Sequence, residues 1–184
     1  MRTILLTPLL ALATTLAVNA EPMSARVLDH RVLPEIDVNG ETMAELSGLA
    51  YDPQTQTVYA VSDRATLFSL AFSTDGETIT ALEPQAAAAL TDADGNALAE
   101  QGFGPEALML RPDETGVLNF AILSESGPRA ALFKRDGGWL SEIDLPSAVR
   151  DSSRQAGKNR GLESIAYHPE LGLVTLPEEP FEPA

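Results

Sequence analysis

Residues 45–61, ELSGLAYDPQTQTVYAV, recur in altered form at residues 104–120, GPEALMLRPDETGVLNF, and at residues 159–174, NRGLESIAYHPELGLV. All three segments have a proline at the same place and a Ser or Glu six residues before it. The prolines are Pro53, Pro112 and Pro169, and the polar residues before them are Ser47, Glu106 and Glu163. A unit that repeats at a period of about 60 residues therefore sets the fold.

Each copy has the pattern of two strands joined by a turn. Apolar residues stand at every second position before the proline, such as Leu49 and Tyr51 in the first copy, which is typical of a half-buried strand. The proline and the polar residues after it predict a turn. A second run of aliphatic and β-branched residues follows each turn: TVYAVSD at 57–63, VLNFAILSE at 117–125 and LGLVTLPEE at 171–179.

Two more strands follow in the first and second copies, with Asp75-Gly76 and Asp136-Gly137-Gly138 as hairpin turns. Four antiparallel strands per unit favour the blades of a β-propeller, and the alternative is an unrepeated β-sandwich. We predict an all-β fold, a partial β-propeller of about three four-stranded blades, the last incomplete. The early segment RVLDHRVLPEI, residues 26–36, is also expected to be a strand.

The second strand of every copy ends in an acid, and these acids are Asp63, Glu125 and Glu178. In an antiparallel pair the start of one strand lies beside the end of the next. If the first strand of each blade is innermost, the acids should meet Ser47, Glu106 and Glu163 at one mouth of the channel. Crowded carboxylates raise one another's pKa unless a cation lies among them, and calcium suits such oxygen ligands. The other interpretation is that each acid caps a strand and faces water.

The composition limits the chemistry that the chain can perform. A formal net charge of −15 argues against binding nucleic acid or an anionic membrane. It also means that a small anionic substrate would need a bridging metal ion. The sequence has no Cys and two His, which excludes thiol catalysis and makes a histidine-rich metal centre improbable. No Gly-x-Ser-x-Gly nucleophile motif is present.

The N-terminal segment MRTILLTPLLALATTLAVNA, residues 1–20, has an early Arg followed by an uncharged apolar run. This pattern predicts a signal peptide cleaved after Ala20 rather than a membrane anchor. We therefore expect a periplasmic or secreted protein whose folded part is residues 21–184.

Several pieces of the repeats resemble the phytase-like β-propeller domain family, which is also described as having esterase-like activity. Residues 45–64 match its Ser-Gly-Leu start and its Ser-Asp-Arg motif, and residues 104–125 match its Glu-containing start followed by Ser-Glu. Asn159-Arg160-Gly161-Leu162-Glu163 matches its Asn-x-Gly-Phe-Glu motif. The resemblance runs from about residue 41 to residue 180. It implies an exported β-propeller that hydrolyses its substrates. Phosphoesters are one of the substrate classes that the resemblance suggests.

The resemblance also implies which residues form the site. The positions that match the family's motifs are Asp63, Arg64, Glu106, Glu125, Asn159, Arg160 and Glu163. Together with the strand geometry, this predicts Glu106, Glu163 and Asp63 as catalytic residues and Arg64, Asn159 and Arg160 as substrate-binding residues. The expected ligands of calcium are Glu106, Glu125, Glu163 and Glu178, the last of which rests on the strand geometry alone. Calcium would polarise a phosphoryl or acyl oxygen and help to activate water. A guanidinium group matches phosphate oxygens in pairs, although each Arg could equally form a salt bridge with one of the many acids. The chain departs from the family at Gly104, where the family usually has Asp, and this weakens the expected metal ring.

Two functional classes remain open at this point. One is a metal-dependent hydrolase acting on phosphoesters or other esters, and the other is a non-catalytic exported binding module or an inactive truncated remnant. A sugar-lactone hydrolase is a weaker third option, because Ser47 stands where an acid would be expected. Since the third copy has only two predicted strands, we expect a chain truncated at its C-terminus. Pairing with a missing C-terminal half would close the ring.

Two stretches carry less information. Residues 83–103, EPQAAAALTDADGNALAEQGF, are predicted to be a surface loop with a turn at DADGN. Residues 146–160, PSAVRDSSRQAGKNR, are locally basic, and they are interpreted either as a solvated loop or as a lid over an anionic ligand.

Overall fold

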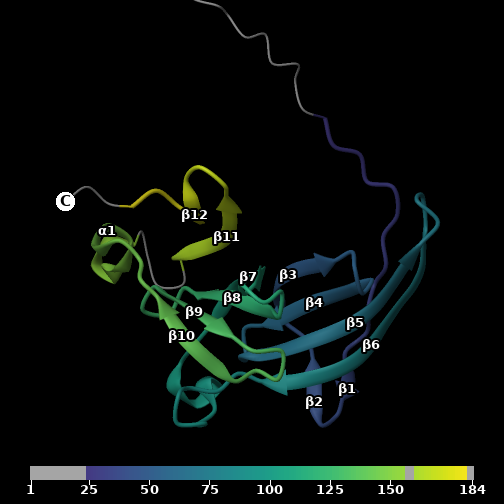
Figure 1. The fold of residues 1–184 in the computed structure, drawn as a ribbon, viewed down its shortest axis with the longest axis horizontal. Helices are drawn as coiled ribbons and strands as arrows, with labels where there is room; N and C mark the ends of the chain where they lie inside the picture. Colours follow the sequence, from purple (N-terminus) through teal and green to yellow (C-terminus); the bar gives the residue numbers. More distant parts are fainter. Residues whose placement is uncertain (1–23, 156–159, 182–184) are drawn as a thin grey trace, which may run out of the picture.

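The computed structural model describes residues 24–155 and 160–181, and within them it is built almost entirely of antiparallel strands (Figure 1). The longer sheets have four strands each. The first consists of β3 (Leu46–Asp52), β4 (Thr57–Ser62), β5 (Thr66–Thr74) and β6 (Ile79–Ala89) in that spatial order. The second consists of β7 (Pro105–Pro112), β8 (Leu118–Ser124), β9 (Arg129–Phe133) and β10 (Trp139–Ile143). We name these sheets blade 1 and blade 2.

A third sheet, blade 3, contains β11 (Leu162–His168) and β12 (Gly172–Pro177). It repeats the inner half of the other blades, because each has the same order of strand, Pro-containing turn and strand. The predicted fold class is confirmed: the chain is an all-β partial propeller with two complete blades and the inner two strands of a third. The sequence pattern succeeds because the period-two alternation of apolar residues appears in every copy.

The first strand of every blade is the innermost, which meets the condition on which the sequence argument for a common mouth depends. The strands β3, β7 and β11 contact one another in turn, although about 60 residues separate each from the next along the chain. Figure 1 shows them near the centre, with β6 and β10 at the outside of their blades. This arrangement places the starts of the three inner strands at a common mouth.

The largest part of the core lies between blades 1 and 2. Alternate residues of β4, among them Tyr59 and Val61, face β8, where Phe120 and Ile122 are completely buried. The rings of Tyr59 and Phe120 lie 4.7 Å apart between their centroids. A smaller cluster joins blade 2 to blade 3. The blades are therefore held by the packing of apolar sheet faces, as expected of a propeller.

A hairpin that the repeats did not predict covers part of the free face of blade 1. It consists of β1 (Ile36–Val38) and β2 (Glu41–Met43), and it packs Val38 and Met43 against Phe68 and Leu70. The prediction of a strand over residues 26–36 is wrong, since only its last residue belongs to β1. The segment before β1 instead runs as irregular chain beside the start of β6.

Two hydrogen bonds attach this irregular segment to blade 1. The carboxylate of Asp29 accepts from the backbone N–H of Ile79 at 2.8 Å, and Arg31 donates to the carbonyl oxygen of Ile79 at 2.6 Å. The backbone N–H and carbonyl oxygen of Ile79 at the edge of β6 are thus hydrogen-bonded to side chains. In a wider sheet the backbone of a further strand would form these bonds.

The prediction of a loop over residues 83–103 is wrong at its beginning. Strand β6 continues to Ala89, with Ala86–Ala89 paired to the first half of β5. Alanine and proline have low β-propensity, but β6 is an outer strand, and its register shifts between the partners of Ser69 and Leu70, where Pro84 lies. Edge strands and bulges are the places where a sheet tolerates proline. The rest of the stretch contains the short 3₁₀ helix η1 (Leu98–Gln101).

The basic stretch after blade 2 contains two short helices, α1 (Ser147–Arg150) and η2 (Ser152–Arg154).

Apolar side chains are exposed on blade 1 and on blade 3, the first and last of the three blades. On β3, Leu49 is 65 % exposed, and on β12, Leu176 is 64 % exposed. The predicted signal peptide, residues 1–20, lies outside the described residues. Within the described ranges no helix has both the length and the apolarity needed to cross a membrane.

Candidate functional site

A β-bulge recurs at the same place in all three inner strands, and it contains the shared polar residue of the repeat. The pairing register shifts between Leu46 and Gly48 in blade 1, between Pro105 and Ala107 in blade 2, and between Leu162 and Ser164 in blade 3. The residues left without a register partner are Ser47, Glu106 and Glu163. A bulge turns a side chain away from the regular alternation and is frequent beside functional sites. Each blade therefore presents this one side chain differently from the rest of its strand.

The acid at the end of the second strand is also fixed in the same way in every blade. The backbone N–H of Asp63 donates to the carbonyl oxygen of Glu45 at 3.1 Å. The same bond joins Glu125 to Gly104 at 3.2 Å and Glu178 to Gly161 at 2.9 Å. The acceptor always lies two residues before the bulged residue. The threefold repetition shows that the three acids are structurally equivalent.

A buried serine supports this geometry in the two complete blades. Ser62 and Ser124 precede the acids and are almost fully buried. The hydroxyl of Ser62 accepts from the N–H of Thr66 at 3.4 Å, and that of Ser124 accepts from the N–H of Gly104 at 3.1 Å. These bonds satisfy backbone donors at the loops around the mouth, so the Ser-Asp and Ser-Glu pairs of the sequence have a structural reason.

Glu106 is the centre of the acidic group. Burial, followed by the negative charges of Glu163, Glu125 and Asp63, raises the pKa of Glu106 from 4.5 to about 7, against the opposing effect of a hydrogen bond from Ser47. Such mutual effects require the carboxylates of three blades to be close together. The structure thus brings together at one mouth the bulged residues and acids that the sequence placed there.

The pKa values of two other acids point the same way. Burial and the charges of Glu125 and Glu178 raise the pKa of Glu163. Burial raises the pKa of Asp63 as well, with a further contribution from Glu45 and an opposing one from Arg64. We name the group of Asp63, Glu106, Glu125, Glu163 and Glu178 the acidic mouth.

The acidic mouth has a consequence for stability. When the pH rises from about 4.5 to about 7, the Glu106 carboxyl loses its proton in the unfolded chain but keeps it in the folded one. The folded state then binds more protons, so the free energy of unfolding falls as the pH rises through this window. Because Gln does not titrate, the free energy of unfolding of the Glu106→Gln protein should decrease less over this pH range than that of the wild-type protein. The expected difference is about 1 to 2 kcal/mol, a value reduced for solvent screening.

Urea unfolding of the wild-type and Glu106→Gln proteins at pH 4.5 and pH 8, with a chelator present, would measure this difference. The acids whose pKa is lowered, such as Asp75 and Asp92 at about 2, act below this window and do not obscure it. An identical dependence on pH in both proteins would contradict the placement of Glu106.

The two arginines assigned to substrate binding both lie in ion pairs. Arg64 Nε lies 2.6 Å from Glu45 Oε2, and Arg160 pairs with Glu179. All four side chains are substantially exposed, so neither pair is a buried structural element. The third residue of that set, Asn159, lies outside the described residues.

The donor chemistry of the acidic mouth fits calcium, because it offers carboxylate oxygens and no soft ligand. The arrangement is more open than a finished coordination shell. Within residues 24–155 and 160–181, no three His, Cys, Asp or Glu side chains are grouped closely enough to hold a metal ion as they stand. The position of Gly104, where the sequence lacks an expected Asp, agrees with this openness.

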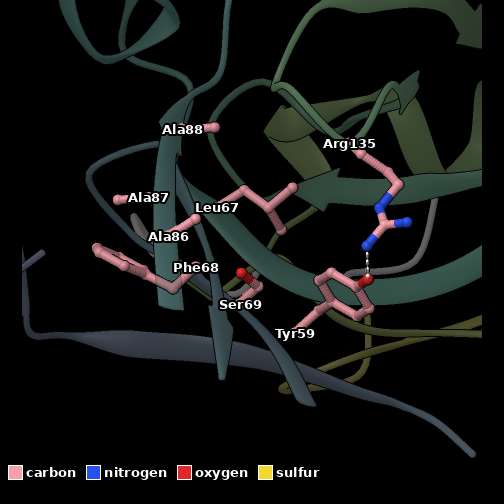
Figure 2. Close-up of a pocket in the computed structure, with 8 residues that line it drawn as sticks. All are labelled: Tyr59, Leu67, Phe68, Ser69, Ala86, Ala87, Ala88 and Arg135. Atoms are coloured by element: carbon pink, nitrogen blue, oxygen red, sulfur yellow. Dashed lines mark hydrogen bonds between the residues drawn. The ribbon is translucent and has the colours of Figure 1, made fainter. Parts of the chain in front are cut away.

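A pocket of about 160 Å³ lies elsewhere, beside the contact of blade 1 with the β9–β10 turn (Figure 2). There Arg135 donates to the hydroxyl of Tyr59 at 2.7 Å, as the dashed line in Figure 2 shows. The other residues that line it are Leu67, Phe68, Ser69, Ala86, Ala87 and Ala88. No member of the acidic mouth is among the lining residues, so this pocket belongs to the packing between blades.

Sequence reasoning placed Ser47 at the mouth but missed two other residues there, Glu45 and Glu179, which hold the two arginines. Ser47 forms a hydrogen bond to Glu106. The position of Ser47 is predictable because it aligns with Glu106 and Glu163 in the repeats. Nothing in the sequence distinguished Glu45 and Glu179 from the other exposed acids.

Comparison with known proteins identifies the family of the chain. A search among curated proteins found no match for this chain. A family model described as "Phytase-like: Esterase-like activity of phytase" matches residues 41–183, which include all the inner strands and the whole acidic mouth. The chain therefore belongs to the phytase-like family.

Proposed function

We propose that this protein is a metal-dependent hydrolase that acts on phosphoesters or other esters at the acidic mouth. The observation that carries the proposal is the recurrence of one bulge and one acid in three blades, which gathers five carboxylates from distant parts of the sequence. Packing alone gives no reason to collect like charges at one place, because their repulsion destabilises the fold.

Glu106 is the residue best suited to move a proton. Its pKa of about 7 places it between its charged and neutral forms near neutral pH, where a general acid or base is most effective. Glu163 and Asp63 also have a raised pKa, and they complete the proposed catalytic set. Ser47 would orient the Glu106 carboxyl through its hydrogen bond.

The proposed ligands of the metal ion are Glu106, Glu125, Glu163 and Glu178, with calcium as the cation that suits them. A bound cation would offset the repulsion among these groups and polarise the phosphoryl or acyl oxygen of a substrate. The substrate is proposed to be a small anion, since the metal would supply the positive charge that the mouth lacks. Arg64, Arg160 and Asn159 are proposed to bind its anionic group.

A calcium titration tests this proposal. We expect calcium to raise the melting temperature more at pH 8 than at pH 5, because the carboxylates are ionised at the higher pH. We also expect hydrolysis of p-nitrophenyl phosphate or p-nitrophenyl acetate that stops in the presence of a chelator. Magnesium at equal concentration serves as the control for ionic strength.

A second candidate is a non-catalytic exported binding module. The observation that favours it is the openness of the acid group, which as it stands provides no set of three ligands within the described chain. Stabilisation by calcium without hydrolysis of either model ester would select this alternative. The absence of any effect of calcium would reject the metal site in both.

A further inference from the structure

Two exposed ion pairs stand beside the acidic mouth, and each uses an arginine that the proposed function assigns to the substrate. In the first pair the side chains of Arg64 and Glu45 are 62 % and 51 % exposed, and in the second those of Arg160 and Glu179 are 47 % and 41 % exposed. Their carboxylates occupy guanidinium groups that would otherwise be free to bind an anion. Solvent has access to both pairs, so an incoming ligand has access as well.

The chain places both carboxylates next to the site itself. The carbonyl oxygen of Glu45 accepts from the N–H of Asp63, and Glu45 adds to the negative charge that raises the pKa of Asp63. Glu179 directly follows Glu178 in the sequence. Each ion pair therefore lies at the edge of the acidic mouth, one in blade 1 and one at the end of blade 3.

Glu45 also occupies a backbone position that disfavours glutamate. Its φ is 52°, in the left-handed region, where glycine is the unstrained residue. Blades 2 and 3 have Gly104 and Gly161 at the equivalent position, and neither of these two glycines has a positive φ, so the left-handed backbone belongs to blade 1 among the three. Blade 1 thus has a charged side chain where the repeat elsewhere has glycine. This side chain accepts a hydrogen bond from Arg64 and also contacts the side chain of Asp63.

We propose that Glu45 and Glu179 are intramolecular competitors that restrict Arg64 and Arg160 to ligands of the phosphate class. This inference rests on the proposed function. A carboxylate ligand offers the guanidinium no more than the resident glutamate already does. A phosphate dianion carries a second charge and a third acceptor oxygen, so it displaces the glutamate, whereas a monocarboxylate does not.

Exposed ion pairs are weak enough for this exchange. Removal of the competitor by Glu45→Gln is expected to tighten the binding of inorganic phosphate about two- to fivefold, the range that corresponds to such a pair. Glu179→Gln should act similarly through Arg160. Acetate must displace the same glutamate, so its affinity should rise by about the same factor as that of phosphate and should remain the weaker of the two.

The experiment is calorimetric titration of the full chain with inorganic phosphate and with acetate, at fixed low calcium. The matched control is Glu114→Gln, which removes the same charge from the β7–β8 turn at the opposite end of the inner strands. A double variant, Arg64→Gln with Glu45→Gln, asks whether Glu45 acts through Arg64. In the Arg64→Gln background the gain from Glu45→Gln should disappear. Glu45→Gly provides a second variant that also relieves the backbone, so its thermal stability should not fall.

The outcomes separate this inference from the proposed function. If the wild-type protein binds phosphate and the Glu45 and Glu179 variants bind it no better than Glu114→Gln, the competitor role is wrong and the proposed function stands. If the gain persists without Arg64, the effect is general charge repulsion and the inference is wrong. If no variant binds phosphate at all, the phosphate class is wrong, and both the inference and that part of the proposed function are lost.

Discussion

Glu106→Gln is expected to lower kcat for a model phosphoester by about 10²- to 10⁴-fold, the usual contribution of a positioned general acid or base. The variant keeps the size of the side chain and its hydrogen bond with Ser47 but has no proton to exchange. Its folding should be unharmed or improved at neutral pH, because it removes one of the crowded charges that give Glu106 a pKa of about 7. A loss of activity without a loss of stability distinguishes a chemical role from a structural one.

The measurement is steady-state hydrolysis as a function of pH, together with urea unfolding of the same samples. Glu142→Gln, on the exposed outer strand β10, is the control for the change in net charge. Without calcium Glu106 titrates around pH 7, and a bound calcium ion favours its ionised form, so the pH dependence of the wild-type activity should lie below pH 7 when calcium is present. Retention of more than a tenth of the wild-type kcat, or an unaltered pH profile in the variant, would remove Glu106 from the chemistry.

The repeat made much of the site predictable. The spacing from Ser47, Glu106 and Glu163 to their prolines is constant, and a constant spacing within equivalent strands produces equivalent positions in space. Antiparallel pairing then determines which end of the second strand meets the first. For this reason the sequence alone predicts the neighbours of Glu106.

The bulge itself was not predictable from this pattern. A bulge adds one residue to one strand, and the period-two alternation on either side remains readable in the sequence. Its importance is that it turns Glu106 toward the mouth while Ala107 and Leu108 remain buried between blades. Ala107 and Leu108 follow the regular alternation, since they pack on opposite faces of the sheet, and Glu106 is the residue that departs from it.

The outer parts of the fold were less predictable because local propensity does not determine them. The second half of β6 is a strand because β5 offers it a partner, although its sequence is rich in alanine. The pairs of Arg64 with Glu45 and Arg160 with Glu179 depend on which of many acids lies nearest. In a chain with 27 acidic residues and 12 basic ones, composition predicts that an arginine is paired but does not identify its partner.

Gly48→Ala is expected to lower the free energy of unfolding by about 2 to 3 kcal/mol, as overpacking of a buried contact does. A Cβ atom at Gly48 would lie 2.7 Å from the backbone nitrogen of Leu108 and 2.9 Å from the carbonyl carbon of Ala107. Both are backbone atoms of β7, so no side-chain rotation can relieve the contact. Blades 1 and 2 would have to move apart along the face where most of the core lies.

The matched control is Gly104→Ala, where the nearest atom to an added Cβ is the Ser126 hydroxyl at 3.1 Å. That side chain can turn aside, so this variant should change the stability by less than about 1 kcal/mol. Thermal and urea unfolding of both variants would measure the difference. Equal stability of the two would show that the spacing of β3 and β7 is not tight. The same displacement would open the mouth to solvent. Burial is the largest cause of the raised pKa of Glu106, so Gly48→Ala should also lower this pKa toward its ordinary value, although loss of the hydrogen bond from Ser47 acts in the opposite direction. This second effect connects the packing of the blades to the chemistry of the mouth, and titration of Glu106 in the folded variant would test it independently of stability.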